Sequence, residues 1–171
     1  SVNKVLELLG GKWNRKAKAH LFPGNPIAIL DEALDAGSVV DEKKTYNFFP
    51  TPETICRDMV IAASLGNGMR VMEPSAGTGA ILTAIWEATG KRCDVAIELN
   101  PQMAKALEPR VGTVICADFL DAIADPTNLF DRILMNPPFE NGSYIKHINP
   151  ALTFLKRGGR LVGGADRGAG L

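Results

Sequence analysis

The sequence is poor in the residues that usually bind metal ions. Its 171 residues include only two histidines, His20 and His147, and three widely spaced cysteines, Cys56, Cys93 and Cys116. None of these residues forms a His/Cys cluster or a HExxH motif, so the sequence argues against a metal site. Each cysteine lies in an apolar segment, which predicts buried free thiols and a cytoplasmic protein.

The chain also has no excess of charge and no long apolar run. Lys and Arg together number 19, as do Asp and Glu, so net charge gives no argument for a polyanionic partner. No apolar segment approaches the roughly 20 residues that cross a membrane, and the start lacks a signal-peptide core. The length and the 46% hydrophobic content fit a single domain with a real core.

Residues 1–47 differ in pattern from the rest and predict an N-terminal helical and basic extension. A short apolar helix is expected around residues 5–9 and should end at Gly10 and Gly11. A second helix is expected to open at Asn25 and Pro26 and to end near Gly37.

Between these helices lies a basic stretch, residues 12–20. Its cations, Lys12, Arg15, Lys16 and Lys18, surround Trp13. Basic side chains beside an aromatic ring suit contact with phosphates and a base. A solvated basic arm explains the same residues equally well.

From residue 48 onward, helical and strand patterns alternate. A helix is expected from Thr51-Pro52-Glu53 onward, and further helices over 79–89, from 101, and near 144–156. Strands are expected at 69–73, 93–98, 112–117, 130–135 and 159–163. Strands separated by helices require crossover connections, so residues 48–171 predict an α/β domain with a doubly wound, mostly parallel sheet.

A glycine-rich turn, Glu73-Pro74-Ser75-Ala76-Gly77-Thr78-Gly79, follows the first expected central strand. Doubly wound sheets bind ligands beyond the carboxyl ends of their strands, and Gly77 and Gly79 would allow close backbone approach. No Gly-Lys-Ser/Thr follows, and Leu82 stands where a GxGxxG would have its third glycine. By itself, the segment also fits a tight strand–helix turn without a ligand.

Two acidic residues end the next two strands. Glu98 follows the glycines by about 20 residues, the spacing at which a carboxylate accepts from both ribose hydroxyls of an adenosine. It also fits an acidic residue at the start of the helix opened by Asn100 and Pro101. Asp118 can accept from an adenine amine while Phe119 packs on the ring, although Asp118 alone fits a turn or N-cap.

The tetrapeptide Asn136-Pro137-Pro138-Phe139 directly follows an apolar strand. The prolines restrict the backbone, so the Asn136 carboxamide oxygen and the Pro137 carbonyl can both accept from one amino group. This arrangement would aim the nitrogen lone pair at an electrophilic methyl, while Phe139 offers a flat face for stacking. A rigid strand-end turn is the alternative.

Together these segments resemble the class I S-adenosylmethionine-dependent methyltransferases of the amino-methyltransferase group. The nearest match is the N6-adenine DNA methyltransferases of mobile elements, whose cofactor motifs precede the catalytic motif. Residues 48–52, Phe48-Phe49-Pro50-Thr51-Pro52, are similar to the first cofactor motif, and residues 73–79 to the glycine loop. Residues 98–101, 118–120 and 136–139 resemble the ribose, adenine and catalytic motifs, in the family order.

The resemblance implies S-adenosylmethionine as cofactor and an exocyclic amino group of a nucleic-acid base as acceptor, with N6 of adenine in DNA favoured. A base in a duplex would have to be flipped into the pocket. The implied cofactor residues are Phe49, Thr51, Glu73, Pro74, Ser75, Ala76, Gly77, Gly79, Glu98, Leu99, Asp118 and Phe119. The implied catalytic residues are Asn136, Pro137, Pro138 and Phe139.

Two departures keep alternatives open. Phe139 replaces the tyrosine usual in the DNA enzymes and also resembles ribosomal RNA guanine-N2 methyltransferases; a protein glutamine methyltransferase presents a similar amine. The sequence ends after the fifth expected strand, so the family's terminal strand hairpin is expected to be missing. We therefore expect a partner or a second copy over that sheet edge, or a longer protein. An inactive cofactor-binding module that binds DNA or protein, as in antirestriction, is the remaining alternative.

Overall fold

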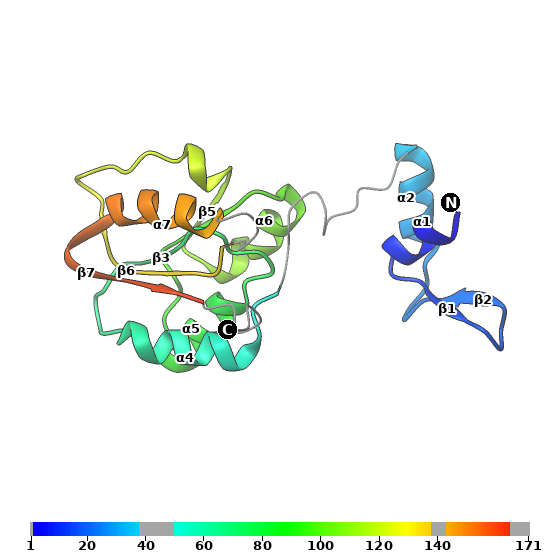
Figure 1. Cartoon of the computed structure of the whole chain (residues 1–171), viewed down its shortest axis with the longest axis horizontal. Coiled ribbons are helices and arrows are strands. Elements are labelled where there is room, and N and C mark those ends of the chain that lie inside the picture. Colours follow the sequence, from blue (N-terminus) through cyan, green and yellow to red (C-terminus); the bar gives the residue numbers. More distant parts are fainter. Residues whose placement is uncertain (1, 38–49, 138–142, 165–171) are drawn as a thin grey trace. The chain divides into compact units, whose positions relative to one another are not determined.

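The computed structural model describes residues 2–37, 50–137 and 143–164. The chain divides into two compact units, residues 1–47 and 48–171 (Figure 1). Among the described residues, no helix has the length and apolar character needed to cross a membrane.

The N-terminal unit contains two helices and a β-hairpin. Its elements are α1 (Val2–Leu8), β1 (Lys12–Asn14), β2 (Ala19–Leu21) and α2 (Ile27–Ala36). Before α2, Asn25 Oδ1 accepts from the backbone N–H of Ile27, and the helix ends at Gly37 in a left-handed conformation with φ of 63°. Both helices thus occur where the capping residues predict them.

The basic stretch forms a hairpin, which the sequence analysis did not predict. β1 and β2 are antiparallel, and Trp13 lies opposite His20. Asn14 Oδ1 accepts from the backbone N–H groups of Lys16 and Ala17, which closes the turn. Strands of three residues are too short to show an alternating pattern, so no periodicity marks them in the sequence.

The second unit is built on a five-stranded sheet with the order β5-β4-β3-β6-β7. Its strands are β3 (Val71–Glu73), β4 (Val95–Glu98), β5 (Thr113–Cys116), β6 (Phe130–Met135) and β7 (Leu155–Gly163). Its helices are α4 (Glu53–Ala63), α5 (Ala80–Thr89), α6 (Pro101–Leu107) and α7 (Ser143–Thr153), with short 3-10 helices η1 (Glu108–Arg110) and η2 (Phe119–Asp121). All neighbouring strands are parallel, so the predicted doubly wound α/β fold is confirmed.

Alternate strand residues pack on opposite faces of this sheet, as the two-residue period of a strand requires. Val71, Ala96 and Leu134 belong to the core that includes buried residues of α4 and α5. Met72, Ile97 and Ile133 belong to the second core, which includes Phe119 and Phe154. Figure 1 accordingly shows α4 and α5 on one side of the sheet and α7 on the other.

The strand order reverses between β3 and β6. From β3 the chain adds β4 and β5 on one side, and then β6 and β7 on the other. Ligands of such sheets bind where the order reverses, beyond the carboxyl ends of the strands. Glu73 is the last residue of β3 and Asn136 directly follows β6, so both predicted motifs lie at this point.

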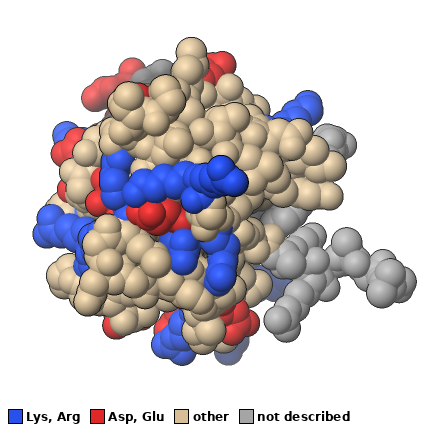
Figure 2. Space-filling view, turned by 90° about the vertical axis from the view of Figure 1, so that its left-hand side faces the viewer, with Lys and Arg blue, Asp and Glu red and all other residues tan. Residues whose placement is uncertain are grey.

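Two arginines join α4 to β6 and β7. The Arg132 Nε donates to the carbonyl oxygen of Ala63, and the Arg160 guanidinium donates to that of Ala62. Cations suit the unsatisfied carbonyls at the C-terminal end of a helix. Figure 2 shows the β7 side of the unit, where Lys and Arg side chains gather around a smaller acidic group.

β7 is the outer strand on its side of the sheet. Among the described residues of this unit, 50–137 and 143–164, no further strand pairs with it. A partner or second copy over this edge stays a prediction.

The prediction of three buried cysteines is wrong for Cys116. Cys56 and Cys93 are buried, whereas Cys116 is exposed. Cys116 ends β5, the outer strand on the opposite side of the sheet, whose residues are mostly exposed. Apolar sequence context alone does not reveal that a strand lies at the edge.

Candidate active site

The glycine-rich turn and the Asn136-Pro137 segment follow two neighbouring parallel strands. β3 pairs directly with β6, with Val71 beside Arg132 and Met72 beside Ile133. Because parallel strands end at the same edge of a sheet, the two segments open at that edge. Glu73 and Asn136, which are 63 positions apart in the sequence, are thereby brought to one site.

Residues 74–79 turn tightly from β3 into α5. Gly77 and Gly79 have φ values of 52° and 77°, which L side chains rarely adopt. A Cβ at Gly79 would lie 2.7 Å from Leu107 Cδ2 and 3.0 Å from Arg110 Nη1. Close packing within the protein therefore accounts for Gly79, and contact of its backbone with a ligand stays a prediction.

Arg110 holds this turn in place, a role that the sequence analysis missed. Its Nη1 donates to the carbonyl oxygen of Thr78 over 2.8 Å, and its Nη2 to that of Gly79 over 2.7 Å. Its Nη2 also donates to the Thr83 hydroxyl in α5. Arg110 lies in η1, about 30 residues along the chain, and no motif marks it.

Glu98 links the ends of β3 and β4. Its side chain is buried, with Oε2 accepting from the backbone N–H of Gly77 over 2.6 Å and Oε1 from that of Asn100 over 2.8 Å. Asn100 in turn accepts from the backbone N–H groups of Gln102 and Met103 and caps α6. Each carboxylate oxygen has a second lone pair, so Glu98 can still accept from two hydroxyls. The next residue, Leu99, is exposed.

Glu73 is the most deeply buried acidic residue of the described chain. It is 1% exposed, and its Oε2 has no hydrogen-bond partner. Burial raises the pKa of its carboxyl well above the usual range, the charge of Glu98 raises it further, and Arg110 and the backbone N–H of Leu82 oppose the shift. A cationic group beside Oε2 would favour the charged carboxylate. The ammonium group of a bound amino acid fits that requirement.

Asp118 and Phe119 lie at the end of β5. Asp118 Oδ1 accepts from the backbone N–H of Leu120 over 2.9 Å and caps η2. Phe119 is 3% exposed, and its ring packs against Phe154 and His147 at centroid distances of 5.7 and 6.2 Å. Asp118 thus serves as a cap and Phe119 as a core residue, and their contacts with adenine stay predictions.

Asn136 contacts the segment that precedes α4. Its Nδ2 donates to the Thr51 hydroxyl oxygen over 3.0 Å, although the two residues are 85 positions apart. Pro137 is buried beside it. The first cofactor motif and the catalytic motif of the sequence analysis therefore meet at this hydrogen bond. The predicted residues Phe49, Pro138 and Phe139 lie outside the described residues.

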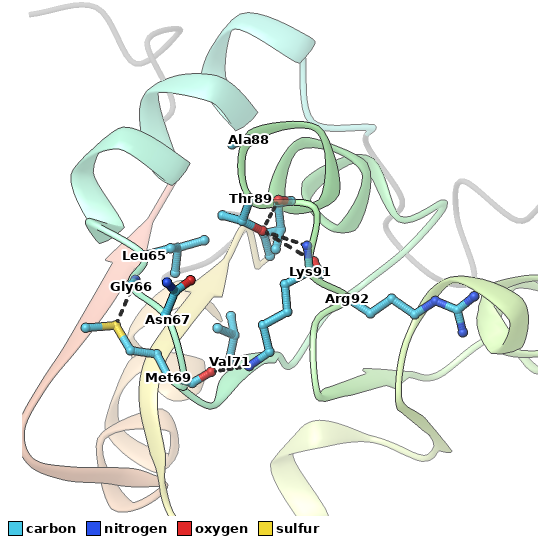
Figure 3. Close-up of a pocket in the computed structure, with 10 residues that line it drawn as sticks. Leu65, Gly66, Asn67, Met69, Val71, Ala88, Thr89, Lys91 and Arg92 are labelled. Atoms are coloured by element: carbon cyan, nitrogen blue, oxygen red, sulfur yellow. Dashed lines mark hydrogen bonds between the residues drawn. The ribbon is translucent and has the colours of Figure 1, made fainter.

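A separate cavity of about 260 Å³ lies near the amino ends of β3 and β4. Leu65, Val71, Thr89 and Lys91 are among its lining residues (Figure 3). The Lys91 Nζ donates to the carbonyl oxygen of Met69 and lies 3.5 Å from Asp94 Oδ2, so it already has partners. None of the predicted site residues lines this cavity. Within residues 2–37, 50–137 and 143–164, no His/Cys/Asp/Glu cluster could hold a metal ion.

No established family profile matches the sequence. Over 91 residues the chain is 42% identical to the type II methyltransferase M.TthHB8I of Thermus thermophilus. This similarity covers 52% of the chain and 20% of the relative, so the chain spans about a fifth of that protein.

Solved structures with a similar fold include methyltransferases. An RNA methyltransferase from Salinibacter ruber, in complex with S-adenosyl-L-homocysteine, superposes with a TM-score of 0.54 at 20% identity, over 67% of this chain and 76% of that one. A protein of Vibrio vulnificus assigned as the modification subunit of a type I restriction enzyme has a TM-score of 0.54 at 18% identity, over 83% of this chain and 38% of that one. The chain therefore has the fold of the class I S-adenosylmethionine-dependent methyltransferases, as its sequence predicts, and the adenine-DNA type stays a prediction.

Proposed function

We propose that this protein transfers a methyl group from S-adenosylmethionine to N6 of adenine in DNA. The observation that carries this proposal is the meeting of two motifs at the point where the strand order reverses. Glu73 and the glycine-rich turn follow β3, while Asn136 and Pro137 follow the neighbouring strand β6. A cofactor site and an amine-binding site at one sheet edge suit methyl transfer between them.

Residues of the first three strand ends hold the cofactor. Oε2 of Glu73, which has no hydrogen-bond partner in the protein, accepts from the ammonium group of the methionine portion. The backbone of residues 75–79 surrounds this portion of the cofactor. Glu98 accepts from the ribose hydroxyls, and Asp118 and Phe119 contact the adenine. When bound, S-adenosylmethionine supplies an electrophilic methyl on a sulfonium centre.

Asn136 and Pro137 hold the target nitrogen. The Asn136 Oδ1 and the Pro137 carbonyl accept from the two N–H groups of the exocyclic amine, which directs the nitrogen lone pair toward the methyl. Stacking of Phe139 on the base is a prediction from the sequence, since this residue lies outside the described part of the chain. Held by Asn136 and Pro137, the amino nitrogen would face the methyl group of the bound cofactor, and the proton that it gives up after transfer would pass to water. No strong base is needed.

Two observations support DNA as the substrate. The relative that is 42% identical over 91 residues is a type II methyltransferase. In addition, the β1–β2 hairpin exposes Lys12, Arg15, Lys16 and Lys18 together with Trp13, which is 50% exposed. Four cations so close together can contact the phosphates of a nucleic acid, and an exposed tryptophan can stack on a base or sugar. In a duplex the target adenine is flipped out of the stack.

The test combines calorimetry with S-adenosylmethionine and a tritium-transfer assay on unmethylated DNA. The Asn136→Ala variant should bind the cofactor like the wild type, while its turnover should fall by at least about 100-fold, because the amine loses an oriented acceptor. Asn67→Ala, at an exposed position in the loop before β3, is the matched control and should keep full turnover. Unchanged turnover in Asn136→Ala would remove Asn136 from the mechanism.

Parallel assays on DNA, RNA and protein separate the substrate classes. Guanine-N2 of ribosomal RNA and the glutamine side chain present the same kind of planar amino group as adenine. Methyl incorporation into DNA alone supports the proposal. Incorporation into RNA alone or protein alone would contradict it and identify that molecule as the substrate. Cofactor binding without transfer to any of the three would identify an inactive binding module.

A further inference from the structure

Two segments remote in sequence enclose the Asn136 carboxamide. On one side, its Nδ2 donates to the Thr51 hydroxyl oxygen over 3.0 Å. On the other side lies the backbone of Gly164: a Cβ built there would lie 2.3 Å from Asn136 Oδ1 and 3.0 Å from Cγ. Real Cβ atoms do not approach other atoms so closely, so a side chain at residue 164 would push the Asn136 carboxamide out of this position.

The backbone that carries these residues is restricted. Thr51 lies between Pro50 and Pro52, and Asn136 precedes Pro137. Proline fixes its own φ and favours extended conformations for the preceding residue. Gly164 is placed by its backbone N–H, which donates to the carbonyl oxygen of Met135 over 3.0 Å.

The three elements next to these residues are also joined at the C-terminal end of α4. Thr51 precedes α4, Asn136 follows β6 and Gly164 follows β7. At the far end of α4, Arg132 of β6 and Arg160 of β7 donate to its last carbonyl oxygens. These contacts hold α4 against the two strands and so fix the geometry between them, as a rigid site requires.

We propose that Thr51 and Gly164 are positioning residues that fix the plane of the Asn136 carboxamide, so that Oδ1 faces the target amino group. The resemblance implies that Thr51 binds the cofactor, whereas in the structure its hydroxyl oxygen accepts a hydrogen bond from Asn136. The inference rests on the proposed function. The Thr51 hydroxyl accepts from Nδ2, which leaves Oδ1 as the carboxamide atom that accepts from the substrate.

Threonine substitutions test the first contact. Thr51→Val keeps the shape but removes the acceptor, and should lower kcat about 10- to 100-fold while the Kd of S-adenosylmethionine stays unchanged. Thr51→Ser restores the hydroxyl and should recover most of kcat. Thr54→Val, the same change at an exposed position in α4, is the control. A weaker cofactor Kd with an unchanged kcat would return Thr51 to the cofactor site and overturn the inference.

Adjacent glycines test the second contact. Gly164→Ala should displace the carboxamide and lower kcat by on the order of 100-fold, again without a change in cofactor Kd. Gly163→Ala adds the same methyl one residue earlier, where a Cβ has nothing within 4 Å, and should leave kcat unchanged. Equal kcat values for the two variants would contradict the inference.

A readout without turnover separates this inference from the proposed function. The side-chain amide signal of Asn136 in a ¹⁵N–¹H spectrum is assigned by its loss in Asn136→Ala, and the exchange rate of its hydrogens is then measured. Exchange should be faster in Thr51→Val than in the wild type and in Thr51→Ser, because the hydrogen bond is lost. Equal exchange in all three would overturn the inference even if DNA is methylated. Faster exchange in Thr51→Val without DNA methylation would support the inference and overturn the proposed function.

Discussion

The backbone N–H of Gly77 donates to Glu98 Oε2 over 2.6 Å, so the turn after β3 and the end of β4 are joined by a carboxylate. The other oxygen, Oε1, accepts from the backbone N–H of Asn100. Each of the two backbone donors thus has its own carboxylate oxygen as acceptor. Backbone groups of the protein therefore hold the Glu98 carboxylate in one orientation.

We expect Glu98→Gln to lower both stability and cofactor affinity. The glutamine NH2 would face one of the two backbone donors and leave it unsatisfied, which costs about 1–3 kcal/mol. For a chain of this size, thermal unfolding should shift down by about 2–4 °C per kcal/mol. Calorimetric scans measure the shift, with Glu87→Gln at an exposed position of α5 as the control. An unchanged transition in Glu98→Gln would show that the Gly77 and Asn100 contacts add nothing to stability.

Glu73 makes stability depend on pH in a direction opposite to that of an ion-paired carboxylate. Burial raises its pKa above the usual value of 4.5, so the native state binds a proton that the unfolded state releases more readily. Its contribution is fully present below the unfolded-state pKa and is lost as pH rises through the folded-state pKa.

Glu73→Gln should therefore match the wild type at about pH 4 and exceed its unfolding free energy at about pH 8. The glutamine oxygen can still accept from the Leu82 backbone, and no charge remains to be buried. Urea unfolding at both pH values measures the difference, with Glu87→Gln as the exposed control. A variant that is less stable than the wild type at the higher pH would mean that Glu73 is charged and paired.

The fold could be predicted because its signals are local. β6 was expected at 130–135 and spans Phe130–Met135, since six apolar-rich residues between polar turns admit few alternatives. Asn100 and Pro101 likewise mark the start of α6 through a cap that needs only neighbouring residues. The β1–β2 hairpin was not predicted, because its strands have only three residues each.

The site could be predicted only in part, because its contacts are long-range. The spacing of Glu98 after the glycines placed it near the turn, but nothing local indicates that both of its oxygens bind backbone amides. Tertiary packing brings three further residues to the site: Arg110, Thr51 and Gly164. Contacts between residues so far apart cannot be predicted from a single sequence.

The three cysteines should differ sharply in reactivity. Burial, followed by the charge of Glu73, raises the pKa of Cys56 to about 11, and the same causes raise the pKa of Cys93. Cys116 is exposed on β5. An aromatic disulfide reagent at neutral pH should therefore modify about one thiol per chain rapidly. Cys116→Ser should abolish this fast phase and Cys56→Ser should not, whereas a second fast thiol would show that one core opens readily.

The β1–β2 hairpin should supply part of the electrostatic affinity for DNA. Residues 12–21 contain four cations and no acidic residue, and the turn closed by Asn14 presents them to solvent. Each cation that contacts a phosphate contributes about 0.9 to the slope of log affinity against log salt. The double substitution Arg15→Ala and Lys16→Ala should thus reduce the slope by about two on any DNA sequence. Lys4→Ala, in α1 outside the hairpin, is the control and should keep the slope.

Trp13 reports on the same contact through its fluorescence. The chain has two tryptophans, so Trp86→Phe leaves Trp13 as the single tryptophan, which can be excited selectively at long wavelength. Trp13 is 50% exposed and lies edge-on to His20 at a centroid distance of 5.2 Å, which holds the ring while one side stays open. Added duplex DNA should quench this emission, and Trp13→Ala should weaken binding by about 1–3 kcal/mol if the ring stacks on a base. Unchanged emission at saturating DNA, together with an unchanged salt slope in the double variant, would leave the hairpin as a solvated basic surface.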